Sequence, residues 1–232
     1  MNIEARLEQV RAEYLHRLTQ GRGDLLHQVE SHLAARQGKM LRPRLTLLAA
    51  ATLGDDHLAA HRTLLLATAV EMLHNASLLH DDVIDRADSR RGQPSVNHLW
   101  NSRVAILVGD YHLAMLMRLL DEVDDPDAAR RINDTVLAMV EGELLQQEIL
   151  AGRQLTADSY LRIIDGKTAR LFATACALGN PEYEQYGLHY GRLFQLRDDL
   201  ADGEANEFTA GLIADEELRL SALTPLQETP ST

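Results

Sequence analysis

Apolar residues recur three and four positions apart along almost the whole chain, which is the spacing of one face of an α-helix. Leu, Ala, Glu, Arg and Gln dominate these stretches, and all of them are good helix formers. No stretch alternates apolar and polar residues as a half-buried strand would, and no hairpin signal occurs. The pattern predicts an all-α fold of roughly eight or nine helices, each about ten to twenty-five residues long.

Short stretches rich in Gly, Pro, Ser and Asp separate the expected helices. They lie at residues 21–23, 54–56, 89–94, 121–126, 152–156 and 179–181. Helices are expected to start at Asp-Asp-Pro (124–126) and at Thr156 with Asp158. The segment 61–85 is apolar on several faces, which predicts a central, buried helix.

Two parts are expected, a catalytic domain over residues 1–205 and a short tail over residues 206–232. Periodicity is weak after Gly203. Within the tail, a short helix is expected at 213–223, and the final residues, TPLQETPST, have the composition of a disordered segment.

Composition narrows the class of protein. With 232 residues, 45% of them hydrophobic, the chain can form one sizeable core. A formal net charge of −12 argues against binding to nucleic acid or to an anionic membrane. No apolar run approaches the ~20 residues of a spanning helix, and the N-terminal stretch lacks the apolar core of a signal peptide. Because Cys176 is the only cysteine, a reducing compartment is expected, and we predict a soluble, cytoplasmic protein.

The first cluster of chemically active residues is Asp81, Asp82 and Asp85. On a helix, Asp81 and Asp85 share a face one turn apart, and like charges there repel unless a cation intervenes. Mg²⁺ prefers carboxylate oxygens and usually bridges to substrate phosphates. A solvated acidic face is the alternative, but the apolar flanks, LHNASLLH before and Val-Ile within, indicate burial and favour a metal site. His74 lies two turns earlier on the face of Asp81.

The same spacing returns at Asp198, Asp199 and Asp202, again at the end of an apolar helix. Two such helices facing each other would offer carboxylates to a cluster of metal ions. Gln195, one turn before Asp199, could donate its amide to the same substrate.

Cations accompany both acidic clusters. The chain has only two lysines against 21 arginines, and each lysine follows a glycine. Arginine forks match diphosphate oxygens in pairs, whereas lysine acts as a compact point charge. The glycine spacing of a P-loop is absent, as are a nucleophile elbow, a Cys–His arrangement and a zinc pattern. The cation set and its polar neighbour are Lys39, Arg42, Arg90, Arg91, Lys167 and Thr168.

Together these residues resemble the trans-polyprenyl diphosphate synthases, the all-helical isoprenyl diphosphate synthase family. The resemblance covers most of residues 20–205 in a fixed order of motifs. These are GKMLRP (38–43), EMLHNASLLHDDVIDRADSRRGQPSVN (71–97), GDYHLA (109–114), EGELLQQ (141–147), DGKTARLF (165–172) and FQLRDDLAD (194–202). The resemblance implies a single-domain helical bundle of the isoprenoid synthase type with a central cavity.

The resemblance also implies roles for individual residues. Isopentenyl diphosphate would bind Lys39, Arg42, His74 and Arg91. The allylic diphosphate would bind Arg90, Lys167, Thr168 and Gln195. The first pair of Mg²⁺ ions would be held by Asp81 and Asp85 with Asp82 assisting, and the second metal site by Asp198 with Asp199 and Asp202. Asp81, Asp82, Asp85, Asp198 and Lys167 would be the catalytic set.

The implied activity is Mg²⁺-dependent ionisation of an allylic diphosphate followed by condensation with isopentenyl diphosphate in trans, and a homodimer is expected. Ala76 and Ser77 precede Asp81 by about one turn, where relatives with short products tend to carry bulky aromatic residues. Small residues here predict a product of geranylgeranyl length or longer, unless they merely pack a neighbouring helix. Leu73, Met115 or Leu116 would form a deeper floor.

The chain departs from the family after the second acidic cluster. The family continues with a lysine-bearing loop and more helices, whereas no lysine follows Lys167 here. The open flank would be covered by a homodimer partner, the tail helix or another subunit. Two alternatives therefore stay open: a non-catalytic or partner-dependent subunit of a heteromeric synthase, and a class I terpene synthase-like enzyme. Two intact acidic clusters favour catalysis, and Lys39, Arg42, His74 and Arg91 argue against the terpene synthase.

Overall fold

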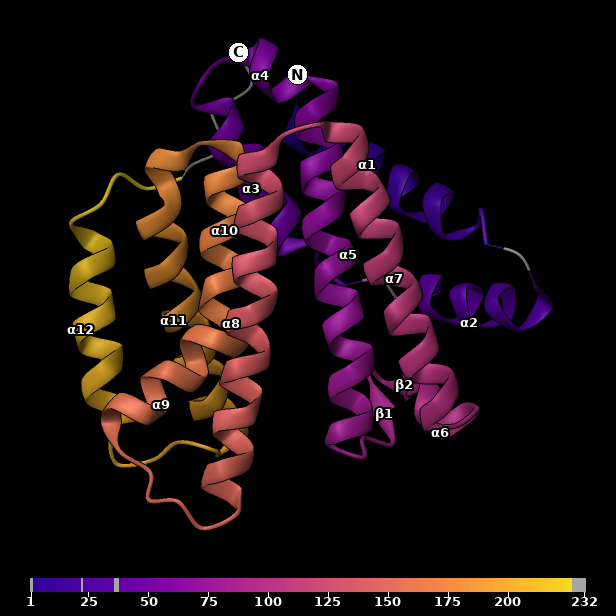
Figure 1. Ribbon diagram of the computed structural model, residues 1–232. Coiled ribbons are helices and arrows are strands. Elements are labelled where there is room, and N and C mark those ends of the chain that lie inside the picture. Colours follow the sequence, from indigo (N-terminus) through magenta and orange to yellow (C-terminus); the bar gives the residue numbers. More distant parts are fainter. Residues whose placement is uncertain (1, 22, 36–37, 227–232) are drawn as a thin grey trace. The chain divides into compact units, whose positions relative to one another are not determined.

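The computed structural model describes residues 2–21, 23–35 and 38–226, and this part of the chain is almost entirely helical (Figure 1). The expected all-α class is confirmed. The described residues form two compact units, residues up to Arg44 with Ala59–Asp125, and Leu45–Leu58 with the residues from Pro126 onward. Helix α3 (Leu41–Ala51) contributes residues to both units.

The first unit is built around one buried helix. Helix α5 (His61–Ile84) is buried on most of its faces, and it packs along α7 and against α1, as Figure 1 shows for α5 and α7. The predicted central helix at 61–85 is therefore confirmed, with Asp85 as its C-cap. The other elements of this unit are α1 (Ile3–Leu18), α2 (Asp24–Ala34), β1 (Ser89–Arg90), β2 (Gln93–Pro94), α6 (Val96–Leu99) and α7 (Ser102–Val123).

A small antiparallel hairpin follows α5, and the expectation that the chain carries no hairpin is wrong here. Strand β1 pairs with β2, with Arg90 opposite Gln93. The two turn residues, Arg91 (φ 53°) and Gly92 (φ 74°), both have positive φ, the signature of a type I′ turn. Because an Arg-Gly turn lacks the Asn or Asp that usually precedes the glycine of a type I′ turn, this hairpin could not be recognised from its residues.

The second unit is a set of helices brought close together by small residues. A Cβ at Gly166 would lie 2.6 Å from the Ala138 carbonyl oxygen, and one at Gly191 would lie 2.7 Å from the Ala169 Cα. Glycine at these positions therefore lets helix backbones approach closely. The elements of this unit besides α3 are α4 (Asp55–Ala59, at the boundary), α8 (Pro126–Leu150), α9 (Ala157–Ile164), the π-helix η1 (Asp165–Ala169), α10 (Arg170–Gly179), the 3₁₀ turn η2 (Pro181–Tyr183), α11 (Glu184–Asp202) and α12 (Thr209–Ser221).

Both predicted helix starts are confirmed. Helix α8 begins at Pro126, and α9 begins after Thr156. The Thr156 side chain accepts from the Ser159 N–H while the Ser159 hydroxyl accepts from the Thr156 N–H, which is a capping box. The expected number of helices was too low, because the short helices α4 and α6 (Val96–Leu99) lie in or beside stretches interpreted as breaks.

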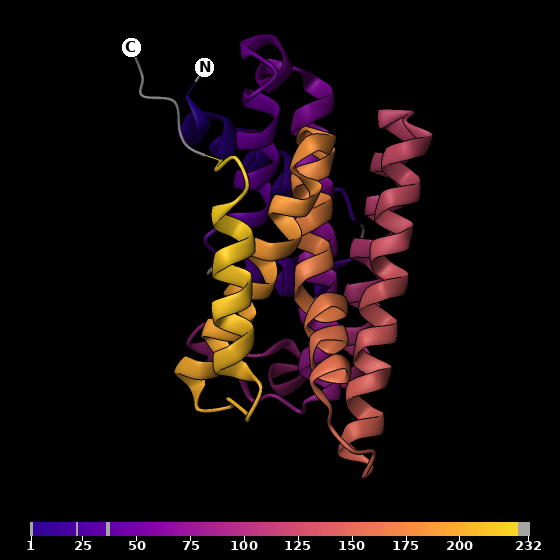
Figure 2. The same cartoon turned by 90° about the vertical axis from the view of Figure 1, so that its left-hand side faces the viewer.

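The tail contains a helix that packs on the second unit. Helix α12 begins four residues earlier than the predicted segment 213–223, and it runs beside α11 (Figure 2). Phe208, Leu212 and Ile213 pack against a cluster formed by α9 and α11. The buried Glu216 pairs with His189 at 2.5 Å and with Arg192 at 3.2 Å. The predicted disorder of the last residues falls mostly on 227–232, which lie outside the described residues.

Among residues 2–21, 23–35 and 38–226, no helix combines the length and the hydropathy that crossing a bilayer would require.

Candidate functional site

The first acidic cluster lies where α5 ends. Asp81 is half-buried and Asp85 is exposed, and the Asp85 N–H donates to the Asp81 carbonyl oxygen at 2.8 Å. The two side chains therefore sit one helical turn apart on one face, as the spacing predicted. This pair is accessible to a ligand.

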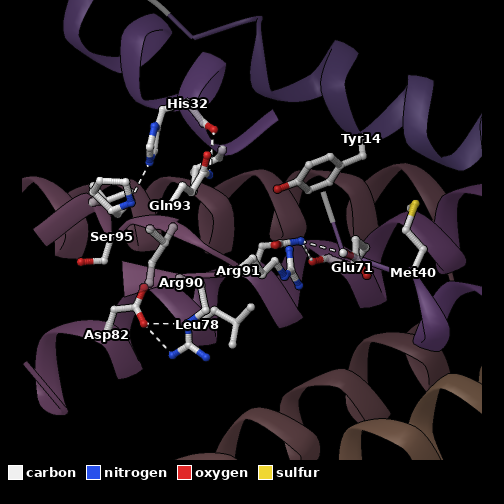
Figure 3. Close-up of a pocket in the computed structure, with 16 residues that line it drawn as sticks. Tyr14, His32, Met40, Glu71, Leu78, Asp82, Arg90, Arg91, Gln93 and Ser95 are labelled. Atoms are coloured by element: carbon white, nitrogen blue, oxygen red, sulfur yellow. Dashed lines mark hydrogen bonds and ion pairs between the residues drawn. The ribbon is translucent and has the colours of Figure 1, made fainter. Parts of the chain in front are cut away.

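Asp82, between them, is tied back into the protein. Its Oδ1 accepts from Arg90 Nε at 2.8 Å and from Arg90 Nη2 at 2.5 Å, and Figure 3 shows the guanidinium directed at this carboxylate. Burial raises the pKa of Asp82, and Arg90 opposes that shift. The hydrogen bonds from Arg90 thus hold the side chain of Asp82, the middle aspartate of this cluster, in a fixed position. The same bonds orient the guanidinium of Arg90.

The hairpin gives the two adjacent arginines different surroundings. Arg90, in β1, reaches Asp82. Arg91 lies at the turn, and a Cβ at Gly38 would come within 2.5 Å of its Nη2. Glycine at 38 therefore leaves room for the Arg91 guanidinium beside Lys39, whose side chain is exposed.

The hairpin is itself held by α2. The Gln93 side-chain amide donates to the His32 carbonyl oxygen at 3.2 Å, and His32 Nε2 lies 2.8 Å from the Pro94 carbonyl oxygen. These contacts hold β2 against α2, and the pairing of β2 with β1 in turn positions the strand that carries Arg90.

Arg42 and His74 are in direct contact. The sequence predicted only that both belong to the same diphosphate pocket. Arg42 Nη1 lies 3.1 Å from His74 Nε2. A guanidinium can only donate, so Nε2 accepts and the imidazole is neutral. Burial, with Arg42, Arg91 and Arg90 adding to it, lowers the pKa of His74 well below its usual range, and burial lowers the pKa of Arg42 to about 10.

Glu71 is a residue that the sequence reasoning missed. It is buried one turn before Asn75, whose amide donates to Glu71 Oε1 at 3.1 Å. Burial raises the pKa of Glu71, although Asn75, Arg42 and Arg91 oppose that shift. Glu71 precedes His74 by three residues, so the two side chains lie close together on the surface of α5. This spacing could have identified Glu71 as a residue of the same site.

Some of these residues line a pocket of about 50 Å³ in the first unit, and Lys39, Arg42 and His74 are not among them (Figure 3). Its lining includes Glu71, Asp82, Arg90 and Arg91, with Gly38 at the edge of the same set. Acidic and basic groups thus alternate around a small opening.

The second acidic cluster has the same design in the second unit. Asp198 and Asp202 are exposed, whereas Asp199 between them is buried. The helix ends at Gly203, whose φ of 77° is the left-handed conformation that glycine adopts without strain. The exposed pair again lies one turn apart.

A chain of hydrogen bonds runs through Asp199. The Thr168 hydroxyl donates to Gln195 Oε1 at 2.7 Å, and Gln195 Nε2 donates to Asp199 Oδ1 at 2.6 Å. The Tyr160 hydroxyl donates to Asp199 Oδ2 at 2.5 Å. The structure thus brings together three predicted residues, Thr168, Gln195 and Asp199, and adds Tyr160, which the sequence reasoning did not select.

Lys167 lies in the π-helix η1, facing α8. Its Nζ donates to Gln146 Oε1 at 2.8 Å and lies 2.7 Å from Glu143 Oε2. Both partners belong to the EGELLQQ stretch. A π-turn shifts the side chains that follow it and is frequent at functional sites, which is consistent with the position of the Gly-Lys-Thr sequence.

The two acidic clusters offer carboxylate oxygens, which are ligands that suit a divalent ion. Each presents a pair of carboxylates, the oxygen donors that Mg²⁺ prefers when substrate phosphates and water complete its shell. Within the part of the chain that the structure describes, no group of three or more His, Cys, Asp or Glu is placed to hold an ion by itself. The donors therefore fit a shared site, in which the ligand supplies the remaining oxygens. The clusters belong to different units, so their facing each other across a cavity stays a prediction.

Ala76 is buried, and Ser77 is half-buried with its hydroxyl donating to the His74 carbonyl oxygen at 2.9 Å. Leu73, Met115 and Leu116 are buried as well. The pocket of Figure 3 is not lined by Ala76 or Ser77, so a channel beside them stays a prediction.

Comparison with known proteins gives a consistent picture. A model of the family described as polyprenyl synthetase matches residues 23–225. An all-trans-nonaprenyl-diphosphate synthase (geranyl-diphosphate specific) from Rhodobacter capsulatus is 37% identical over 196 residues, which are 81% of this chain and 60% of that protein. Heptaprenyl diphosphate synthase component 2 from Bacillus subtilis is 33% identical over 220 residues, 90% of this chain and 60% of that protein.

Solved structures agree. A polyprenyl synthase from Caulobacter crescentus CB15, complexed with calcium and isoprenyl diphosphate, has a TM-score of 0.81 and 34% identity. The match covers 88% of this chain and 64% of that one. The chain spans about 60% of the length of the curated relatives named above.

Proposed function

Since the chain belongs to the polyprenyl synthetase family, we propose that it is a prenyltransferase that condenses isopentenyl diphosphate with an allylic diphosphate in trans. The observation that carries the proposal is made in both units. Each has an accessible pair of aspartates one helical turn apart, with a middle aspartate anchored by hydrogen bonds. Such pairs suit a ligand that brings its own oxygens, as a diphosphate does.

Isopentenyl diphosphate binds through Lys39, Arg42, His74 and Arg91. The contact between Arg42 and His74 supports this assignment, because it holds the guanidinium and the neutral imidazole side by side. A neutral imidazole can itself donate through its second nitrogen. The exposed Lys39 adds a point charge beside Arg91.

The allylic diphosphate binds through Arg90, Lys167, Thr168 and Gln195. Arg90 is already oriented by Asp82, and Lys167 by Glu143 and Gln146. Groups held in place before the reaction lose less entropy when the transition state forms. Thr168 donates to Gln195 and Gln195 donates to Asp199, so the Gln195 amide is held in place while its second N–H can donate to an incoming oxygen.

The reaction breaks the allylic C–O bond, and the electron pair leaves with the diphosphate. The double bond of isopentenyl diphosphate then attacks the allylic cation, and the condensed cation passes a proton to the departed diphosphate, which gives a diphosphate five carbons longer. Mg²⁺, held by Asp81 and Asp85 with Asp82 assisting, and by Asp198 and Asp202 with Asp199 assisting, would neutralise charge on the leaving diphosphate. The fixed cations of the chain hold both diphosphates and keep their negative charge compensated.

We propose a product of geranylgeranyl length or longer. Ala76 has the smallest side chain that could line a channel beside α5, and the buried Leu73, Met115 and Leu116 would close its far end. The named relatives from Rhodobacter capsulatus and Bacillus subtilis are synthases of long products, nonaprenyl and heptaprenyl, which supports the same assignment.

We propose a homodimer as the working assembly. Helix α8 exposes Leu137, Val140 and Leu144 at helical spacing, an apolar stripe that is costly to leave in water. A partner-dependent subunit remains the second candidate, because one relative is named as component 2 of its synthase. Light scattering of the purified chain, with Leu144→Glu as the disrupting variant, separates a homodimer from a monomer that awaits another subunit.

The activity is tested by incubating the purified chain with Mg²⁺, isopentenyl diphosphate, and farnesyl or geranylgeranyl diphosphate, and by separating the products by chain length. Elongated diphosphates are expected. A cyclised hydrocarbon formed from the allylic substrate alone would instead identify a terpene synthase-like enzyme. No turnover until a second subunit is added would identify the partner-dependent candidate.

A further inference from the structure

Tyr160 lies at the centre of the second unit, yet none of the roles above uses it. It is buried in the cluster with Ile164 and Leu196, and its ring packs under the residues that lead into α12. Its hydroxyl lies 2.5 Å from Asp199 Oδ2 and 3.4 Å from the Thr209 hydroxyl.

Both carboxylate oxygens of Asp199 accept a hydrogen bond in this arrangement. Oδ1 accepts from Gln195, and Oδ2 accepts from Tyr160. A buried carboxylate held on both oxygens has a fixed rotamer. It stands between Asp198 and Asp202 in the sequence, and both of those side chains are exposed.

The first acidic cluster also has a middle aspartate held by hydrogen bonds, but the donor there is an arginine and not a tyrosine and a glutamine. There the middle aspartate, Asp82, is held by Arg90, and its neighbours Asp81 and Asp85 are the accessible pair. Two independent clusters thus share one division: a buried, anchored middle carboxylate and two outer carboxylates that are partly or fully exposed.

We propose that Tyr160 is a positioning residue for the second acidic cluster: with Gln195 it holds Asp199 so that Asp198 and Asp202 keep the orientation that binds metal and diphosphate. This inference rests on the proposed function. Without the hydroxyl, Asp199 Oδ2 would be a buried, unpaired anion, and it would turn toward water or toward the approaching cation. The outer pair would then lose its fixed spacing.

The test compares Tyr160→Phe with Tyr183→Phe, which removes a tyrosine hydroxyl elsewhere in the same unit. Two quantities are measured: the Mg²⁺ concentration for half-maximal turnover, and the rise in melting temperature on adding Mg²⁺ with inorganic pyrophosphate. Because the ring is kept, Tyr160→Phe is expected to fold. Its half-maximal Mg²⁺ concentration should rise about tenfold, the loss typical of one hydrogen bond to a charged group, and its ligand-induced melting shift should shrink. Tyr183→Phe should match the wild type in both.

A second comparison does not depend on the fold of Tyr160→Phe. In Asp199→Asn the amide oxygen can still accept from Tyr160, so an anchored Asp199 predicts a smaller rise in the Mg²⁺ requirement than Asp198→Asn produces. An equal or larger rise would overturn the inference. So would a Tyr160→Phe enzyme that melts earlier without ligand but keeps the wild-type Mg²⁺ dependence. A wild-type chain with neither turnover nor a melting shift would instead contradict the proposed function.

Discussion

Helices α8 and η1 cross closely at Gly166. The variant Gly166→Ala therefore tests whether this close approach requires a residue without a side chain. A Cβ at Gly166 would lie 2.6 Å from the Ala138 carbonyl oxygen and 2.7 Å from the Gly142 Cα. Both neighbours are backbone atoms, so neither can move away by changing a rotamer. The added methyl group would be about 0.8 Å too close to the carbonyl oxygen for ordinary contact, and the two helices must separate by a similar amount.

The magnitude follows from two opposing effects. Overpacking of this kind costs about 1–3 kcal/mol. Replacing glycine by alanine in a helix recovers about 0.5–1 kcal/mol. The midpoints of these two ranges leave a net fall of about 1 kcal/mol in the free energy of unfolding, which lowers Tm by roughly 2–4 °C in a chain of this size.

The assay is denaturant unfolding followed by circular dichroism, with Gly211→Ala as the matched control. Gly211 lies in α12, and a Cβ added at this position would have no heavy atom within 4 Å. Its alanine variant should therefore be more stable than the wild type by about 0.5–1 kcal/mol. Gly166→Ala should also lower turnover, because Lys167 would shift away from Glu143. Equal stabilisation of both variants would refute the steric reasoning.

Three further variants test the site. Asp81→Ala should cut turnover by about 100-fold or more while Tm changes little, since this side chain lies at a helix end and is half-buried; product formation near the wild-type rate would remove its metal role. His74→Gln should change the pH dependence of stability, measured as the difference in unfolding free energy between wild type and variant. The pKa of His74 is lowered in the folded state, so its contribution is complete above pH ~6.5 and is lost as pH falls below that value, by up to about 1.4 kcal/mol per pH unit. A constant difference between pH 7.5 and pH 5.5 would contradict a neutral, buried imidazole. Ala76→Phe should shorten the product in chain-length analysis, and an unchanged product distribution would exclude a channel beside α5.

The sequence predicted those features that depend on local pattern. Helix α5 was found because its apolar residues continue without a break, and α9 because Thr156 and its neighbours form a helix cap. The spacing of each acidic cluster correctly placed its outer aspartates on one helix face. These features need no information from distant parts of the chain.

The sequence could not predict the partners that the fold supplies. Tyr160 and Asp199 are 39 residues apart, and nothing in either local stretch marks the hydrogen bond between them. In the sequence, Glu71 is simply a polar residue within an apolar helix. Its importance becomes visible only from its burial and from its hydrogen bond with Asn75. The hairpin was missed because Arg91 adopts a positive φ that is uncommon for residues other than glycine, asparagine and aspartate.

That hairpin has a consequence for how this segment can vary. Arg90 reaches Asp82, and Arg91, the next residue, lies against Gly38, so the two guanidinium groups serve different neighbours. A turn of only two residues has no slack, and side chains along a strand alternate in direction. Inserting or deleting a single residue here would exchange the directions of the arginines while leaving the composition almost unchanged. The segment therefore tolerates substitution more readily than any change in its length.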